Sequence, residues 1–255
     1  MHDLTYVIYS HTDYLDVLKV HSDYLSSYSN KILLINKNDF ELDELYTKYK
    51  KVLFYDDSLP YASRLLILNQ LNLIYILFIH DIDIIVKKNE LILNNLVYEM
   101  IKHNIDRIDL QYRHKKWIYD KNPLNLEIDS QKFILYHRTD ITNYTYNVNP
   151  SIWKLSSFIS IMSRFRNETY RSIENSTIQD ACAKEFKTYG IYAEQFINSG
   201  WFGCVEWFQY IHILKKGMSL PPTNNNLDGC LLNDYNNIIN RLYREPYPSY
   251  VGPLR

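Results

Sequence analysis

The sequence has 255 residues, 46% of them hydrophobic and 22% charged, with a formal net charge of −1. A chain of this size can bury a core of its own, so disulfide or metal staples are not required for folding. The balanced charge disfavours a nucleic-acid partner held by a strongly basic surface. The first glycine is Gly190, which excludes glycine-rich phosphate loops, and the common dehydrogenase, kinase and ATPase motifs, from the first three quarters of the chain.

The cysteines and the apolar segments indicate the compartment. Cys182, Cys204 and Cys230 form no C-x-x-C pair, which argues against a zinc ribbon or a disulfide framework and favours a reducing environment. The N-terminus has no basic segment or cleavage site of a signal peptide. The longest apolar stretch, residues 71–86, is too short and too polar to span a bilayer. We therefore expect a cytoplasmic protein (in the host cytoplasm if the source is a virus) without a transmembrane segment.

Strand and helix patterns alternate along the first half of the chain. Apolar and β-branched runs predict strands at residues 4–10, 31–35, 51–55 and 75–79. Helical spacing of apolar residues predicts helices at 12–28, 43–50, 61–73 and 90–103. This alternation indicates βαβ units, and the strand at 75–79 is apolar throughout, as expected of a strand buried on both faces. The 24 tyrosines are interpreted as a codon bias of a low-GC genome.

The second half continues with a less regular pattern. Strands are predicted at residues 107–111 and 132–137, helices at 152–164, 177–189 and 234–243, a loop at 113–130 and a turn at 147–150. Ser176 is expected to cap the helix at 177–189 and Gly190 to end it. Residues 208–214 form a late apolar segment. The prediction is an α/β fold in a single domain, with a mixed, mainly parallel sheet flanked by helices.

The sharpest local feature is the triplet Asp81-Ile82-Asp83, directly after the apolar strand YILFIH. Ligands of open α/β sheets collect beyond the carboxyl ends of the strands. Two carboxylates one residue apart can approach the same hard cation, Mg²⁺ or Mn²⁺, which would neutralise a leaving nucleotide diphosphate. Many such triplets are surface turns, but two unpaired acids at the end of a buried strand are costly. The position therefore favours a metal site.

Three segments resemble the GT-A glycosyltransferases, in particular a family of small nucleotide-sugar transferase-like proteins. They are VIYSHTDYLDVLKVHSDYL, YASRLLILNQLNLIYILFIHDID and YTYNVNPSIWK. The first is similar to the opening strand and helix that hold the nucleotide, the second to a helix with an early arginine followed by the D-x-D strand, and the third to an acceptor-side segment. Ile173-Glu174 lies where that family tends to carry Phe-Glu. The resemblance implies a nucleotide-binding half at residues 1–110 and, at residues 111–255, an acceptor-binding half and C-terminal tail.

The resemblance assigns donor-binding roles to residues near the predicted strand ends. The residues implied to bind the nucleotide sugar are Ser10, His11, Thr12, Asp13, Arg64, Asp81, Lys216 and Trp153. For the segment after the first strand, the alternative is an ordinary loop with Thr12 or Asp13 as a helix N-cap. Arg64 is otherwise a surface arginine with a solvated head, and Trp153 is otherwise a core residue rather than a platform for a sugar.

The implied metal ligands are Asp81, Asp83 and His212. His212 lies in YIHILKKG, where Lys215, Lys216 and Gly217 follow; a satisfied core histidine is the alternative, and His suits Mn²⁺ better than Mg²⁺. His80 is treated as a structural or supporting group, because strand alternation points it away from one of the acids.

Glu174 and Asp180 are the candidates for the general base of an inverting transferase, which would take the proton of the acceptor hydroxyl. Glu174 is preferred, because a carboxylate in the first turn of a helix, as at Asp180, is favoured by the helix dipole alone.

The leading hypothesis is a metal-dependent glycosyltransferase in glycan biosynthesis. Its donor would be a nucleotide-diphosphate sugar, a UDP-sugar by default, its acceptor a hydroxyl of a glycan or glycoconjugate, and its cofactor Mn²⁺ or Mg²⁺. Inversion is favoured over retention. One alternative is a sugar-nucleotide nucleotidyltransferase, although SHTDYLD lacks the glycine-rich loop that usually opens those enzymes. The other is a non-catalytic binding protein on a degenerate transferase fold.

Overall fold

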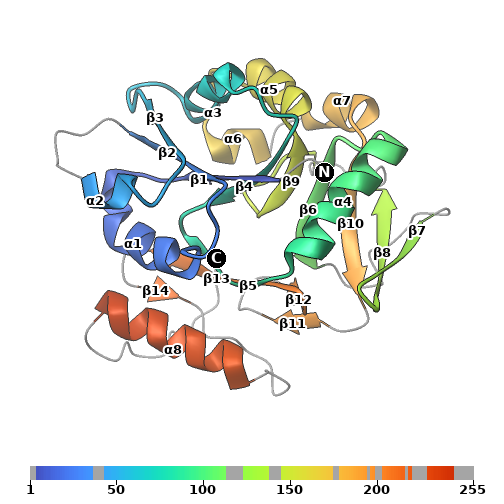
Figure 1. Cartoon of the computed structure of the whole chain (residues 1–255). Coiled ribbons are helices and arrows are strands. Elements are labelled where there is room, and N and C mark those ends of the chain that lie inside the picture. The colour runs from blue at the N-terminus through green and yellow to red at the C-terminus, as the bar shows by residue number, and fades with distance from the viewer. Residues whose placement is uncertain are drawn as a thin grey trace.

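The computed structural model describes residues 4–36, 43–112, 123–137, 145–174, 178–193, 196–198, 203–215, 218–219 and 229–243. These residues form one continuous sheet with helices on both sides (Figure 1). The strands are β1 Thr5–Tyr9, β2 Lys31–Asn36, β3 Lys51–Tyr55, β4 Tyr75–His80, β5 Asp83–Lys88, β6 Arg107–Tyr112, β7 Leu124–Ile128, β8 Gln131–His137, β9 Ser151–Lys154, β10 Thr188–Ala193, β11 Phe196–Asn198, β12 Gly203–Val205, β13 Phe208–Lys215 and β14 Met218–Ser219.

The helices vary widely in length. The α-helices are α1 Leu15–Tyr24, α2 Asp43–Tyr46, α3 Tyr61–Leu65, α4 Glu90–His103, α5 Leu155–Arg164, α6 Tyr170–Glu174, α7 Ile178–Glu185 and α8 Gly229–Tyr243, with 3₁₀ turns at Thr12–Tyr14 (η1) and Leu66–Gln70 (η2). The predicted helix at 12–28 is therefore a 3₁₀ turn followed by α1, and α8 begins five residues before the predicted start at 234. None of the helices in the described part is both long and apolar enough to cross a membrane.

The first half of the sheet is parallel, as the alternating pattern predicts. β1 pairs in parallel with β2 and β4, and β2 with β3. Side chains alternate between two core layers: Tyr6 and Ile8 of β1 belong to one, Val7 and Tyr9 to the other. Residues of α1 and α4 complete the first layer, and residues of α3, η2 and α5 the second, so that helices cover both faces (Figure 1). The prediction of an α/β fold with a mixed sheet flanked by helices is confirmed.

The second half of the sheet is built mainly from antiparallel pairs. β9 lies between β4 and β6 and runs antiparallel to both. β6 also pairs in parallel with β10, which pairs antiparallel with β8. β13, near the end of the chain, runs antiparallel to β5. The carboxyl end of β4 therefore lies beside segments that are distant in sequence.

Several secondary-structure predictions after β4 differ from the structure. Residues 83–88 form a strand that sequence reasoning missed, and the predicted loop at 113–130 contains β7. Ile152 and Trp153 belong to β9 rather than to the helix, which begins at Leu155.

Gly190 lies inside β10 and does not end a helix, because α7 ends at Glu185. A Cβ at Gly190 would come within 2.5 Å of the Tyr136 hydroxyl, so the glycine makes room for a ring on the neighbouring strand. The expected cap Ser176 lies outside the described residues.

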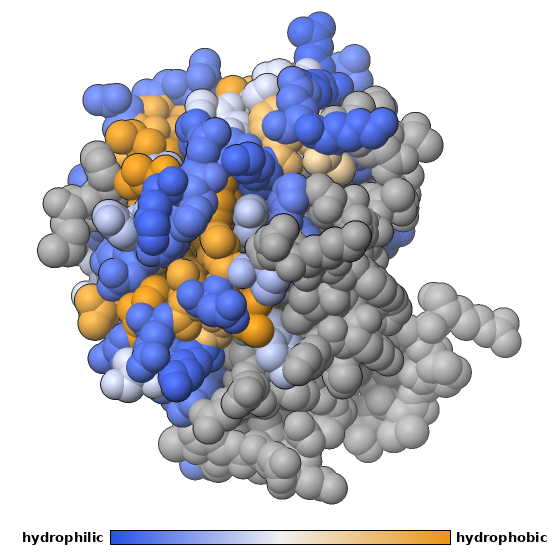
Figure 2. Space-filling model, turned by 90° about the vertical axis from the view of Figure 1, so that its right-hand side faces the viewer, coloured by the Kyte–Doolittle hydropathy of each residue, from blue (hydrophilic) through white to orange (hydrophobic). Residues whose placement is uncertain are grey.

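One face of α4 is apolar and exposed. Leu91, Tyr98 and Ile101 are 54%, 61% and 47% exposed, and their spacing of seven and three residues places them on one side of the helix. Figure 2 looks onto the side of the molecule where α4, β7 and β8 lie in Figure 1, and shows apolar surface between hydrophilic side chains. The opposite side of α4, with Leu93 and Leu96, is fully buried.

Candidate functional site

The two acids of the D-x-D triplet lie in the turn between β4 and β5. The N–H of Asp81 donates to the carbonyl of Tyr9 (2.9 Å), which extends the pairing of β4 with β1 by one residue. Asp83 begins β5 and faces β13. The two residues are only 4% and 2% exposed. The fold therefore buries two carboxyl groups at the carboxyl edge of the parallel strands, where an α/β sheet binds its ligands.

Asp81 is held by the segment that follows β1. The hydroxyl of Ser10, itself buried, donates to Asp81 Oδ2 at 2.5 Å. Burial raises the pKa of Asp81 to about 7, and the nearby charge of Asp83 adds to the effect, although hydrogen bonds from Ser10 and from the backbone of Ile82 and His11 oppose it. Asp81 and Ser10, both predicted to bind donor, are thus in direct contact.

Asp83 is held by the end of the chain. Its Oδ1 lies 2.6 Å from Nδ1 of His212, which is directly opposite in the β5–β13 register. The sequence prediction placed His212 beside the acids, and the structure brings them together across 129 residues. His212 makes this contact with the carboxylate itself. In this geometry it orients Asp83, and ligation of a metal through Nδ1 would require that bond to break.

The side chains at this turn could supply some of the ligands of a cation, and a bound substrate would supply the rest. No three His, Cys, Asp or Glu side chains in the described part of the chain are grouped so that they could hold a metal alone. However, Asp81 and Asp83 lie close enough for the charge of one to raise the pKa of the other. Mg²⁺ is commonly held by one or two carboxylates together with substrate phosphates. The site therefore suits a two-carboxylate cation whose remaining ligands come from a diphosphate and water.

The segments after β1 and β3 are joined by charged side chains. His11 Nε2 lies 2.9 Å from Asp57 Oδ2, and Arg64 Nη1 lies 2.8 Å from Asp57 Oδ1. Arg64 also donates to the carbonyls of Leu59 and Asp57 and to the hydroxyl of Tyr9. Four of the five N–H groups of its guanidinium are therefore engaged within the protein. The alternative of an arginine with a solvated head does not apply, because Arg64 fixes the loop beside His11. The role of Arg64 in donor binding stays a prediction.

Thr12 and Asp13 occupy different environments in the same segment. Thr12 forms two hydrogen bonds with Asn36 at the end of β2, one through its N–H and one through its hydroxyl (2.8 and 3.0 Å). Asp13 is exposed, and its N–H donates to the His11 ring. The N-cap of η1 is thus His11, not Thr12 or Asp13. Thr12 links two strand ends, whereas Asp13 lies at the open rim.

A chain of aromatic hydrogen bonds behind the acids was missed by sequence reasoning. His80 Nε2 lies 2.8 Å from the Tyr61 hydroxyl, which lies 2.5 Å from that of Tyr146. Tyr9 and Tyr55 stack beside them at 5.1 Å between ring centroids. Burial lowers the pKa of His80 to about 4. His80, predicted to be a structural or supporting group, is close enough to Asp83 and His212 for their charges to act on its pKa. The sequence signal that was available is the tyrosine at the end of β1 and of β3, Tyr9 and Tyr55.

The two candidate bases and Trp153, which was predicted to bind the nucleotide sugar, lie in separate places. Glu174 ends α6, where its Oε1 accepts a hydrogen bond from the N–H of Val148 (3.0 Å), and burial raises its pKa. Asp180 lies in α7, but its side chain is outside the description. Trp153 is fully buried against Phe158 and Arg107. Its ring has no exposed face for a sugar, so the alternative of a core residue applies.

The lysines that follow His212 are not described in full. Lys215 ends β13, its side chain lies outside the description, and Lys216 and Gly217 lie outside the described residues. Cys182 is a buried free thiol, and the side chains of Cys204 and Cys230 are outside the description.

Protonation of Asp81 is expected to make stability depend on pH. Its pKa is about 7 in the folded protein against an ordinary value of 3.8, so between these values the folded state keeps a proton that the unfolded chain releases. The free energy of unfolding should therefore fall, by up to a few kcal/mol, as the pH rises through this window. Asp81→Asn should flatten the dependence in urea unfolding with chelator, whereas exposed Asp16→Asn should leave it unchanged. An equal slope in wild type and Asp81→Asn would contradict the assignment.

Comparison with known proteins identifies no family. No protein-family model matches the sequence, and no curated protein is significantly similar to it. Solved structures do show similarity. A cytidylyltransferase from Leptospira borgpetersenii has a TM-score of 0.45 at 12% identity, over 76% of this chain and 78% of that chain. An apo UDP-glucose pyrophosphorylase has a TM-score of 0.45 at 10% identity, over 94% and 98% of the two chains.

A third solved structure is S. aureus TarS 1–349, with a TM-score of 0.43 and 13% identity over 74% of this chain and 60% of that chain. All three scores lie below 0.5, and similarity at this level carries no argument about activity. The class that the structure itself defines is an α/β protein with two buried carboxyl groups at the carboxyl edge of its parallel strands. The function must be argued from that site.

Proposed function

We propose that this protein is a glycosyltransferase that moves a sugar from a nucleotide diphosphate, UDP by default, to a hydroxyl of a glycan or glycoconjugate. The observation that carries the proposal is the buried pair of Asp81 and Asp83 at the end of β4, supported by Ser10 and His212. Two buried acids with so little compensating charge favour a cation, and a cation there favours an anionic donor.

The loops around this pair form the proposed donor site. Ser10 orients Asp81, and His212 orients Asp83, so both carboxylates are fixed before a ligand arrives. His11 and Asp13 lie at the rim after β1, where a ribose or base would bind. Arg64 is proposed to position the site indirectly: it forms an ion pair with Asp57, and Asp57 in turn contacts His11. The site is thus largely preformed, which reduces the entropic cost of donor binding.

Mn²⁺ or Mg²⁺, when bound by Asp81 and Asp83, would stabilise the negative charge of the departing nucleotide diphosphate. The protonation of Asp81 explains how this carboxyl group tolerates burial. Without a cation its pKa is near 7, so below that pH half or more of the molecules carry a proton on Asp81. Cation binding favours the ionised form and releases this proton, so metal affinity should increase with pH.

Glu174 is the proposed general base. Its raised pKa brings it closer to the working range of a base at neutral pH, and the Val148 N–H fixes one carboxylate oxygen. The other oxygen would accept the proton of the acceptor hydroxyl as that hydroxyl attacks the anomeric carbon. A base in this role would give inversion, in which the acceptor attacks from the side opposite to the leaving diphosphate.

A thermal-shift panel tests the donor and metal proposals together. UDP-sugars, GDP-sugars, and UTP with a sugar 1-phosphate would each be added to the full chain, with Mn²⁺ and with chelator. We expect a UDP-sugar to raise the melting temperature only when Mn²⁺ is present, by the linkage of binding to folding. Stabilisation by UTP, with pyrophosphate release, would instead identify a nucleotidyltransferase. Binding of a donor with no transfer or hydrolysis would identify a non-catalytic binding protein.

A further inference from the structure

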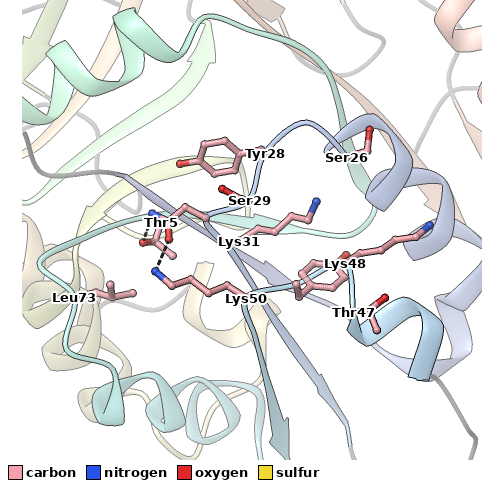
Figure 3. A pocket seen from close by; sticks show the side chains of 11 residues that line it. Thr5, Ser26, Tyr28, Ser29, Lys31, Thr47, Lys48, Lys50 and Leu73 are labelled. Carbon is pink, nitrogen blue, oxygen red and sulfur yellow. Dashed lines mark hydrogen bonds between the residues drawn. The ribbon is translucent and has the colours of Figure 1, made fainter.

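A second pocket lies at the opposite edge of the same parallel strands. It has a volume of about 850 Å³ and is lined where β1 to β4 begin, by Thr5, Ser26, Tyr28, Ser29, Asn30, Lys31, Thr47, Lys48, Tyr49, Lys50 and Leu73 (Figure 3). Asp81 and Asp83 lie beyond the other end of these strands. The pocket is therefore separate from the proposed donor site and plays no part in it.

Lys31 is the unusual residue of this pocket. It is only 2% exposed, and its ammonium donates to the carbonyl of Leu25 at 2.6 Å and lies 5.7 Å from the centre of the Tyr49 ring. Within the described part of the chain, no carboxylate lies within ion-pair distance of Lys31. A buried charge with only neutral partners is costly, so the fold keeps a cation here without the acid that would normally accompany it.

The other charges around the pocket increase this imbalance. None of the eleven lining side chains is acidic. The adjacent Asp23 is shared between Lys48 (2.9 Å) and Arg241 (2.5 Å), so one carboxylate serves two cations. Lys50 donates to the amide oxygen of Asn30. Burial lowers the pKa of Lys31, and the positive charges of Lys88 and Lys48 lower it further.

We propose that this pocket binds a phosphate-bearing small molecule. Lysine ammonium groups serve as point charges for phosphate, and the hydroxyls of Ser26 and Ser29 belong to the same lining as further donors. In Figure 3, the side chains of Lys31 and Lys48 extend to the same side, toward the Ser26 end, and Lys50 extends the other way, toward Thr5. A bound phosphate supplies the negative charge that the lining residues lack.

Calorimetric titration of the full chain with inorganic pyrophosphate, without divalent metal and at constant ionic strength, tests the proposal. We expect saturable binding that Lys31→Met, Lys48→Gln and Lys50→Gln each weaken by about tenfold or more, because each removes one positive charge. Lys51→Gln is the matched control, since Lys51 is exposed and next in sequence but does not line the pocket. Asp83→Asn, at the other edge of the sheet, should leave binding unchanged.

Two results would overturn the proposal. One is the absence of binding at millimolar pyrophosphate, and the other is equal affinity in Lys48→Gln, Lys50→Gln and wild type. Lys31→Met also removes the hydrogen bond to Leu25, so the two exposed-lysine variants decide the outcome if circular dichroism shows that Lys31→Met is unfolded. Tighter binding of UMP than of inorganic phosphate would identify a nucleotide as the ligand, and equal binding would identify the phosphate group alone; both support the site.

Discussion

Replacement of Asp83 by asparagine is expected to abolish metal-dependent transfer while leaving the fold intact. Asparagine can still accept a hydrogen bond from His212, which preserves the β5–β13 contact, but it lacks the charge that attracts a divalent cation. The loss of one preorganised electrostatic group at a reacting centre commonly costs on the order of 10²- to 10³-fold in rate. The measurement is the initial rate of UDP release from a UDP-sugar as Mn²⁺ is titrated.

The control for this prediction is Asp16→Asn, which removes an exposed carboxylate from α1 and should behave as wild type. Circular dichroism and urea unfolding of Asp83→Asn establish that the variant is folded. If Asp83→Asn releases UDP at the wild-type rate and with the wild-type Mn²⁺ dependence, then Asp83 does not bind the metal, and the proposed function loses the observation on which it rests.

Glu174→Gln should slow transfer strongly without weakening donor binding. Glutamine keeps an oxygen that can accept the Val148 N–H, so the loop before β9 should stay in place, but the amide cannot take a proton. General base catalysis typically contributes 10²- to 10⁴-fold, so a decrease of about that size is expected in kcat. Donor affinity, measured by calorimetry with a UDP-sugar and Mn²⁺, should remain unchanged.

Glu168→Gln is the matched control, because Glu168 lies just before α6 and is only partly buried. The pH profile separates a base from a structural residue: the wild type should lose activity as Glu174 becomes protonated at low pH, and Glu174→Gln should lack this limb. A variant with the wild-type rate, or one whose donor affinity falls together with its rate, would assign Glu174 to the support of the Val148 loop instead.

The parallel half of the fold could be predicted because its signals are local. Each strand from β1 to β4 contains an apolar run, and each intervening helix shows its own spacing. β1, β2 and β3 are neighbours both in sequence and in the sheet, and β4 returns to pair with β1. β5 and β7 are as long as β1 to β4, but they carry more polar residues and pair with antiparallel partners. β5 pairs with β13, more than a hundred residues later, and no local pattern records such a pairing. The role of Gly190 was mispredicted for the same reason: a glycine is needed at this position because the ring of Tyr136 on β8 leaves no room for a Cβ.

The candidate site also has a part that could be predicted from local sequence and a part that could not. Asp81, Asp83, Ser10 and His212 could be chosen from their residue types and their places at strand ends, and the structure brings them together in pairs. Their protein partners could not be chosen, because those contacts depend on side-chain directions. Arg64 turned inward to the loop at Asp57, and the hydrogen bonds between Tyr61, Tyr146 and His80 join three separate segments.

The pairing of β13 with β5 has a consequence for biosynthesis. When the ribosome has produced the first hundred residues, Asp83 already exists but its histidine partner has not yet been translated. Until residue 212 arrives, β5 lacks its antiparallel neighbour and remains an unpaired edge. A product truncated before residue 212 would therefore keep the contact of Asp81 with Ser10 but lack the partner of Asp83, so the proposed cation site would be incomplete.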